Sequence, residues 1–120
     1  MAVRAVRGAI QVDADDPDEI YGAVQEMVAA VLDRNALQSE DLISIFFTST
    51  PDLTSCFPAA GARQAGLSDV PLLCASEIAV PDALPRIVRL LAHVETTKDR
   101  AEIRHAFLGA AGALRDDLPQ

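Results

Sequence analysis

Residues 16–35 carry a complete set of signals for a long helix. The presence of one such helix limits which faces of a sheet can be shielded from solvent within one chain. Asp16 provides a capping side chain, Pro17 occupies the first helical position, and Glu19 is placed to reach back to the cap. Apolar residues at helical spacing follow, namely Ile20, Val24, Met27, Val28, Val31 and Leu32. We expect this helix to end between residues 33 and 35. One long helix covers only one face of a sheet, so the second face of any sheet here needs other cover.

Five further segments have the β-branched and aromatic content that is typical of strands. They are residues 1–12, 43–50, 70–75, 86–94 and 103–108. The segment 86–94 also matches a helical stripe, and we favour a strand because of its β-branched residues and the prolines before it. We expect a short Ala-rich helix that begins at Pro58 and ends at Gly66, which serves as its C-cap. Residues 109–114 are a small-residue segment long enough for one helical turn.

These elements predict an α+β fold, with a mixed five-stranded sheet, one long helix and one or two short helices. We expect a single domain over residues 1–120, in which residues 116–120 form a mobile tail. Phe46 and Phe47 are neighbours in one predicted strand, so their side chains point to opposite faces and both faces need apolar cover. A monomer with such an exposed face would aggregate, and we therefore expect a closed homo-oligomer.

Charge and composition exclude several classes of function. Ten basic residues against 18 acidic ones give a net charge of −8, whereas binding to nucleic acid or an anionic membrane surface needs a basic footprint. No apolar run reaches the ~20 residues of a bilayer span, and Arg4 and Arg7 interrupt the N-terminal apolar stretch in a way that does not fit a signal peptide. Cys56 and Cys74 are too few for a disulfide framework. We expect a cytoplasmic protein with free thiols.

The usual ligand and nucleophile patterns are missing from the sequence. His93 and His105 lie far apart, with no Cys or carboxylate at ligand spacing around either, so we expect no metal site. The glycines lack the strand–turn–helix context of a phosphate-binding loop. Cys56 and Cys74 fit small core residues better than nucleophiles. We expect no cofactor.

Arginines inside apolar segments are the feature that points to a ligand. Nine of the ten basic residues are arginine, and Lys98 is the one lysine. Arg7 and Arg89 interrupt predicted strands, Arg63 lies in the short helix, and Glu77 directly follows an apolar segment. One interpretation is a buried Arg–Glu pair that holds strands together. The other follows from the excess of positive charge, which favours a ligand with two carboxylates or a phosphate held bidentately.

From end to end the chain resembles the small monofunctional chorismate mutases of the AroH class. The resemblance rests on residues 3–9 (Val-Arg-Ala-Val-Arg-Gly-Ala), 49–53 (Ser-Thr-Pro-Asp-Leu), 57–59 (Phe-Pro-Ala) with Arg63, 70–77 (Val-Pro-Leu-Leu-Cys-Ala-Ser-Glu), Arg89, 103–108 (Ile-Arg-His-Ala-Phe-Leu) and Leu114-Arg115. Each of these segments alone is a weak signal for the family. Their order and spacing along the chain together are specific for it.

This resemblance implies the unimolecular rearrangement of chorismate to prephenate in phenylalanine and tyrosine biosynthesis, without metal, cofactor or covalent intermediate. It implies that Arg89 faces the ether oxygen whose bond to the ring breaks and that Arg7 binds the side-chain carboxylate. It also implies that Glu77 accepts a hydrogen bond from the ring hydroxyl. The other positions implied to bind substrate are Phe57, Arg63, Leu73, Cys74, Phe107, Leu114 and Arg115. It also implies a homotrimer that forms a pseudo-α/β barrel, with sites in the clefts between subunits.

Three positions depart from the family pattern. Two alternative functions also remain compatible with the sequence. The family usually has Tyr at the position of Phe107, Lys at Ala60 and Pro at Asp116. The loss of a hydroxyl at position 107 predicts weaker substrate binding. The alternatives are a trimeric imine deaminase of similar fold and a non-catalytic trimer that binds an anionic metabolite.

Overall fold

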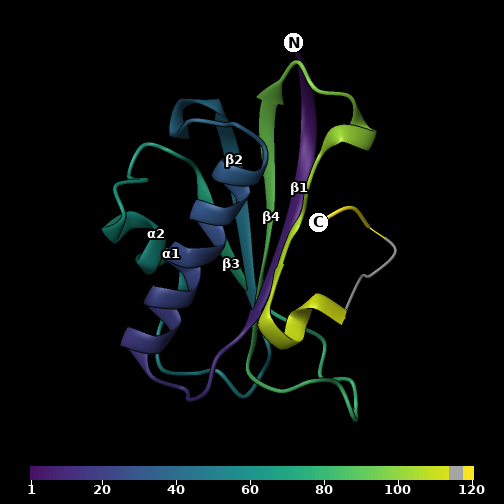
Figure 1. The fold of residues 1–120 in the computed structure, drawn as a ribbon. Coiled ribbons are helices and arrows are strands. Elements are labelled where there is room, and N and C mark those ends of the chain that lie inside the picture. The colour runs from purple at the N-terminus through teal and green to yellow at the C-terminus, as the bar shows by residue number, and fades with distance from the viewer. Residues whose placement is uncertain (114–117) are drawn as a thin grey trace.

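The sheet of this protein has five strands with both parallel and antiparallel pairs (Figure 1). In the computed structural model, which describes residues 1–113 and 118–120, the strands are β1 (Ala2–Gln11), β2 (Leu42–Ser49), β3 (Leu72–Ser76), β4 (Ile87–Thr96) and β5 (Ala106–Leu108). Their order is β3-β2-β4-β1-β5. β4 is antiparallel to β1 and β2, while β3 runs parallel to β2 and β5 parallel to β1. The predicted α+β fold with a mixed five-stranded sheet is confirmed.

The long helix α1 (Pro17–Arg34) begins and ends where the sequence predicts. The carboxylate of Asp16 accepts a hydrogen bond from the backbone N–H of Glu19 at 3.2 Å, which satisfies one of the free donors of the first turn. Asn35 is the residue that follows the last turn. The buried face of α1 consists of Ile20, Ala23, Val24, Met27, Val28 and Val31.

The short helix α2 (Pro58–Gln64) packs closely against α1. Gly61 is buried there, and a Cβ atom at this position would lie 2.9 Å from the Tyr21 Cα and 3.2 Å from the Tyr21 carbonyl oxygen. Both of these are backbone atoms that cannot easily move aside. Gly66 follows α2 with a φ of +99°, a conformation in which glycine has no Cβ penalty. The predicted closure of this helix by Gly66 is confirmed.

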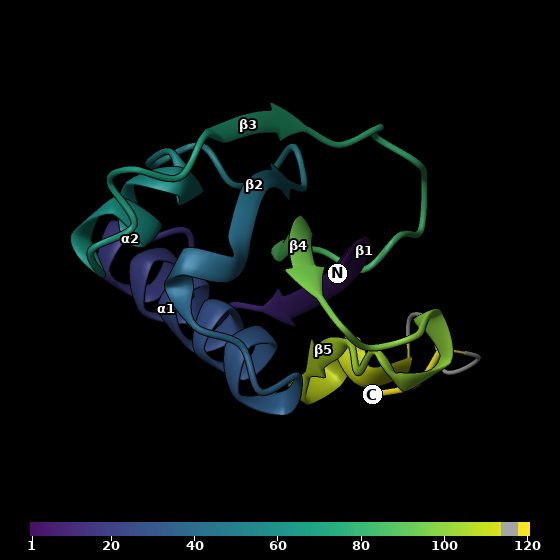
Figure 2. The same cartoon turned by 90° about the horizontal axis from the view of Figure 1, so that it is seen from above.

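Both α-helices cover the same face of the sheet, and the main core lies between them and the strands (Figure 2). Alternate residues of the central strands enter this core: Val6 and Ile10 from β1, Ile45 and Phe47 from β2, and Val88, Leu90, Ala92 and Val94 from β4. We call this the helix face and the opposite side the open face. A smaller cluster of Ala9, Ile87, Phe107 and Ala111 lies beside the 3₁₀ helix η3 (Gly109–Ala113), with Leu118 packed against it.

The last strand is much shorter than the predicted segment 103–108. Residues 103–105 are not part of β5, because their backbone groups bond elsewhere. The side-chain amide of Asn35 accepts from the Arg104 N–H at 2.7 Å and donates to the Arg104 carbonyl at 2.8 Å. The His105 N–H donates to the Pro119 carbonyl at 2.7 Å. The strand prediction was therefore wrong for these three residues. Two further 3₁₀ turns are η1 (Ser39–Asp41) and η2 (Arg100–Glu102).

The open face exposes apolar side chains from three strands. Val3 of β1, Phe46 of β2 and Leu73 of β3 are 57%, 43% and 58% exposed, whereas Phe47 is fully buried on the helix face. The predicted split between Phe46 and Phe47 is confirmed, and so is the apolar second face. Over residues 1–113 and 118–120, no helix is long and apolar enough to cross a membrane.

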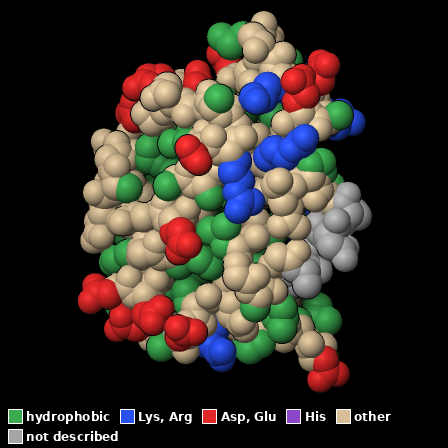
Figure 3. Space-filling model, in the orientation of Figure 1, with side chains coloured by type: hydrophobic (Ala, Val, Ile, Leu, Met, Phe, Trp, Pro, Cys, Tyr) green, Lys and Arg blue, Asp and Glu red, His purple; other side chains and the backbone are tan. Residues whose placement is uncertain are grey.

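Charged groups are unevenly spread over the side that carries the helices. Figure 3 shows acidic side chains at the lower left, over the N-terminal end of α1, and further acidic side chains along the upper edge, beside a group of basic side chains. The acidic group includes Asp13, Asp18, Glu19 and Glu26, which line one shallow pocket. The arginines of interest for function lie in strands β1 and β4, and their side chains belong to the other face.

Candidate active site

The strand pattern puts the predicted arginines on the open face. Arg7 in β1 lies between the buried residues Val6 and Gly8, and Arg89 in β4 lies between the buried residues Val88 and Leu90. Since side chains alternate along a strand, both arginines project away from the helices. β1 and β4 are neighbours, and Arg89 pairs across them with Ala9, two residues from Arg7.

Glu77 reaches Arg89 from the end of β3. Its backbone N–H donates to the Ser49 carbonyl at 2.9 Å, which extends the parallel pairing of β2 and β3 by one residue. Its carboxylate accepts from Nε of Arg89, with distances of 3.0 Å to Oε1 and 3.2 Å to Oε2. The side chains of Arg89 and Glu77 are 27% and 17% exposed, so solvent screens this ion pair only in part. An Arg–Glu pair, one of the two interpretations left open by the sequence, is therefore present, and it is half-buried on the open face.

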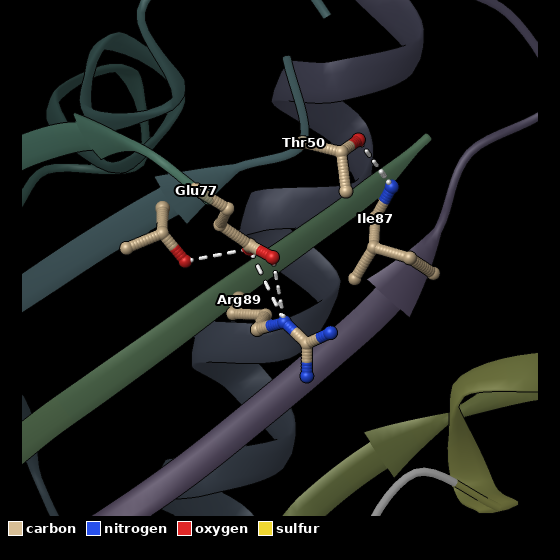
Figure 4. A network of polar contacts seen from close by, with 5 residues as sticks. Thr50, Glu77, Ile87 and Arg89 are labelled. Atoms are coloured by element: carbon tan, nitrogen blue, oxygen red, sulfur yellow. Dashed lines mark hydrogen bonds and ion pairs between the residues drawn. The ribbon is translucent and has the colours of Figure 1, made fainter. Parts of the chain in front are cut away.

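The ion pair uses one side of the guanidinium and leaves the other side available. Figure 4 shows the two terminal nitrogens of Arg89 pointing away from Glu77. Within the described part of the chain, neither of these Nη atoms donates a hydrogen bond. The second carboxylate oxygen of Glu77 also accepts from the Thr48 hydroxyl at 2.8 Å. Arg89 thus presents a fixed pair of N–H groups of the kind that binds oxygen anions.

Hydrogen bonds at the start of β4 hold the strand that carries Arg89. The Thr50 hydroxyl accepts from the Ile87 N–H at 3.1 Å (Figure 4), and the Asp52 carboxylate accepts from the Arg86 N–H at 2.9 Å. Arg86 has a φ of +54°, which is uncommon for a residue with a side chain. A hydrogen bond from Thr50, followed by the one from the Arg86 backbone, holds the pKa of Asp52 below its ordinary value of 3.8.

Arg7 lies at a cavity on the open face. The cavity has a volume of about 700 Å³, and Arg4, Arg100, His93 and His105 line it together with Arg7. The Arg7 backbone N–H donates to Nδ1 of His105 at 2.9 Å. Three of these residues are arginines, which give this part of the face a cationic character.

The ring of Phe107 lies under the guanidinium of Arg7. The guanidinium carbon of Arg7 lies 5.8 Å from the centre of the Phe107 ring, within the range of a cation–π contact. Phe107 is only 4% exposed, since it belongs to the small cluster under η3. The structure therefore brings Arg7, Glu77, Arg89 and Phe107 to one face of the sheet.

Four other predicted residues lie at the far edge of the sheet. Phe57 precedes α2 and is 72% exposed, and Arg63 is exposed in the last turn of that helix. Leu73 is on the open side of β3, whereas the Cys74 thiol accepts from the Ala59 N–H at 3.3 Å and faces α2. β2 and β4 separate β3 from β1, a distance of about 14 Å across three strand spacings. Within one chain these residues are not assembled around Arg7.

Leu114 and Arg115 lie outside the described residues. Cys56 and Cys74 are free thiols. In the described ranges, 1–113 and 118–120, no three or more His, Cys, Asp or Glu side chains are grouped so that they could hold a metal ion.

Comparison with known proteins decides the family. The model of the family described as chorismate mutase type I matches residues 3–118. The chain belongs to this family.

Two relatives and one solved structure support that assignment over the whole chain. Chorismate mutase AroH of Thermus thermophilus is 47% identical over 117 residues, which cover 97% of this chain and 96% of the relative. Chorismate mutase AroH of Bacillus subtilis is 32% identical over 119 residues, with coverage of 98% and 94%. The structure of a chorismate mutase from Clostridium thermocellum matches with a TM-score of 0.88 and 40% identity, over 90% of this chain and 96% of that one.

Two polar side chains of this chorismate mutase family member were not singled out as site residues from the sequence. Thr48 bonds to Glu77, and His105 bonds to the backbone of Arg7. A signal for Thr48 was available, since it lies two residues from Phe46 and therefore on the same face of β2. A similar signal was available for His105, which lies two residues before Phe107 in the predicted strand 103–108, although the structure has an irregular segment there.

Proposed function

We propose that this protein is a chorismate mutase that converts chorismate to prephenate. The observation that carries the proposal is Arg89, held at Nε by Glu77 with its two Nη groups directed to the open face. Membership of the type I family agrees with this chemistry and does not favour an imine deaminase or a non-catalytic binder.

The proposed reaction is a unimolecular rearrangement, so the protein has two tasks. It has to hold the flexible enolpyruvyl arm over the ring in the reactive conformer, and Arg7 is suited to grip the carboxylate of that arm. It also has to stabilise negative charge on the ether oxygen as the bond breaks, which the Nη groups of Arg89 can do without reorganisation. A fixed donor of this kind is worth about 3–4 kcal/mol in the transition state.

We further propose that each site is shared between two chains of a homotrimer. Arg7 lies on the open face of β1, while Phe57 and Arg63 belong to the region of α2, which packs beside β2 and β3 on the helix face of the same chain. A neighbouring chain placed against the open face would bring its α2 edge to Arg7 and cover the exposed apolar side chains. Free thiols at both cysteines agree with a cytoplasmic location, which is part of the same proposal.

Turnover of chorismate by the purified protein tests the proposed function. The loss of chorismate absorbance is followed together with the appearance of prephenate, and the mass in solution is measured on the same sample. We expect turnover and a mass of three chains. If chorismate persists while an imino acid is hydrolysed, the protein is a deaminase; tight binding of a bicyclic transition-state mimic without turnover identifies a binder.

A further inference from the structure

We propose that Thr48 is a positioning residue for the reaction, which keeps the Glu77 carboxylate on Nε of Arg89 and away from the Nη groups. This inference rests on the proposed chorismate mutase function. It names a side chain that was not among the expected site residues, and it assigns that side chain a single task.

Three strands bring the three groups together. Thr48 of β2 and Arg89 of β4 are directly paired, and Glu77 arrives from the end of β3 on the other side of β2. All three side chains are half-buried on the open face. The pairing of β2 with β4 sets Thr48 beside Arg89, and the backbone bond from Glu77 to Ser49 holds Glu77 directly after the end of β3.

The hydrogen bond between Thr48 and Glu77 has a defined direction. A carboxylate has only acceptor oxygens, so the Thr48 hydroxyl donates to Oε2, over a distance of 2.8 Å. The same oxygen lies 3.2 Å from Nε of Arg89, and Oε1 lies 3.0 Å from Nε. Both oxygens of Glu77 thus approach one N–H group, and the hydroxyl anchors the carboxylate from the opposite side.

This arrangement differs from the common pairing of arginine with a carboxylate. In that pairing two parallel N–H groups bind the two oxygens, so that at least one N–H of an Nη group is occupied. Here the Glu77 carboxylate accepts hydrogen bonds only from Nε of Arg89. Both Nη groups therefore stay available to a substrate oxygen. Without the Thr48 hydroxyl, the Glu77 carboxylate is free to rotate into the two-bond pairing and remove a donor from the site.

The test compares variants of Thr48 that keep or lose the hydroxyl. Thr48→Val has nearly the same shape and suits a strand, and we expect it to lower kcat about tenfold, in line with the loss of a hydrogen bond to a charged group. KM should change by less, because the Nη donors matter most in the transition state. Thr48→Ser should restore kcat to within about twofold of the parent, since it keeps the donor.

Ser44→Ala is the matched control. Ser44 lies on the same strand and face, and its hydroxyl contacts His93 at 3.3 Å, away from Glu77. This variant should leave kcat within about twofold of the parent, because it touches none of the three groups. Thr48→Ala removes the same hydroxyl and is measured in parallel, so that a folding defect of one variant does not decide the outcome. Circular dichroism and mass in solution report the fold of each.

A double-mutant cycle asks whether Thr48 acts through Glu77. In a Glu77→Ala background, Thr48→Val should change kcat by less than about twofold, since both acceptor oxygens of residue 77 are already gone. An equal tenfold loss in both backgrounds overturns the proposal, and so does a Thr48→Val enzyme with parental kcat.

A crystal structure of Thr48→Val separates this proposal from the proposed function. We expect Glu77 to contact an Nη group of Arg89 in that variant. If the parent fails to turn over chorismate, the proposed function is wrong, and the structure alone then decides the role of Thr48. A Glu77 carboxylate that stays on Nε alone in the variant overturns the positioning role.

Discussion

The backbone N–H of Arg7 donates a hydrogen bond to the imidazole Nδ1 of His105, 2.9 Å away. The pairing of β1 with β5 begins one residue later, at Gly8 and Ala106. The imidazole therefore takes the place of a backbone carbonyl just before the ladder starts. Because Nδ1 accepts this bond, it carries no proton. The contact fixes the backbone of Arg7 at the point from which its guanidinium lies over Phe107.

His105→Asn should keep most of the activity, because its amide oxygen places an acceptor near the position of Nδ1. His105→Leu removes the acceptor and leaves the Arg7 N–H without it. We expect a rise in KM of about tenfold for His105→Leu, since Arg7 is proposed to grip a substrate carboxylate. Steady-state kinetics on chorismate check this. Equal KM values for the two variants would show that the acceptor does not position Arg7.

Substitution of Arg89 tests the fixed-charge mechanism directly. Arg89→Ala should lower kcat by about 10²- to 10³-fold, as expected for the loss of one preorganised donor. Arg89→Lys should recover little, because an ammonium on a flexible stem cannot bind Glu77 and present two further N–H groups at once. Both variants should keep the fold, which the thermal unfolding curve reports. Near-parental turnover by the lysine variant would contradict the mechanism.

Phe107→Tyr should tighten substrate binding. A hydroxyl at this position stands near the Arg7 guanidinium and adds a donor for a substrate carboxylate. A hydrogen bond to a charged group contributes about 1.5–3 kcal/mol, so KM should fall at least about tenfold with little change in kcat. The matched variant Phe107→Leu removes the ring and should raise KM. An unchanged KM in Phe107→Tyr would mean that another group already binds this carboxylate.

Phe46→Glu should break the proposed trimer. Phe46 is 43% exposed at the middle of the open face, and a carboxylate there would be buried without a partner in the interface. Mass in solution should fall to that of one chain, with loss of turnover. Ala29→Glu, on the exposed side of α1, is the control and should remain trimeric and active. A trimeric Phe46→Glu protein would show that the open face is not the interface.

Asp52 should make the fold sensitive to acid. Its pKa is held below 3.8 in the folded chain, chiefly by the Thr50 hydroxyl, so its carboxylate stabilises the fold above that pH and this contribution is lost as the pH falls through the folded pKa. Asp52→Asn should therefore lower Tm at neutral pH, with a difference from the parent that shrinks below about pH 4. Asp69→Asn, an exposed change elsewhere, is the control. A pH-independent difference for Asp52→Asn would contradict this account.

Local signals in the sequence were sufficient for most of the fold. The capping set at Asp16 and Pro17 defined α1, and β-branched content favoured a strand over a helix in the segment 86–94, where the structure has β4 (Ile87–Thr96). The segment 103–105 was predicted wrongly because its backbone bonds to Asn35, which is 69 residues away from Arg104. The periodicity of the sequence does not predict such a contact. The contact depends on the tertiary structure, which brings the end of α1 to residues 103–105.

The site was predictable where residue type alone indicated chemistry. Arg7, Glu77 and Arg89 stood out as charges in apolar segments, and the structure puts them on one face. Thr48 carries no such mark, because threonine is an ordinary strand residue and its role depends on the register that pairs it with Arg89. The positions of Phe57 and Arg63 relative to the arginines depend on a second chain, which a single sequence does not place.

The close approach of the two helices at Gly61 has a consequence for how this enzyme can vary. A methyl group at that position would push against the Tyr21 backbone, so any larger residue has to move α2 outward. α2 carries Arg63 and begins directly after Phe57. The absence of a side chain at position 61 therefore sets the distance between α1 and α2. A mutation there would shift Phe57 and Arg63, although neither side chain contacts position 61.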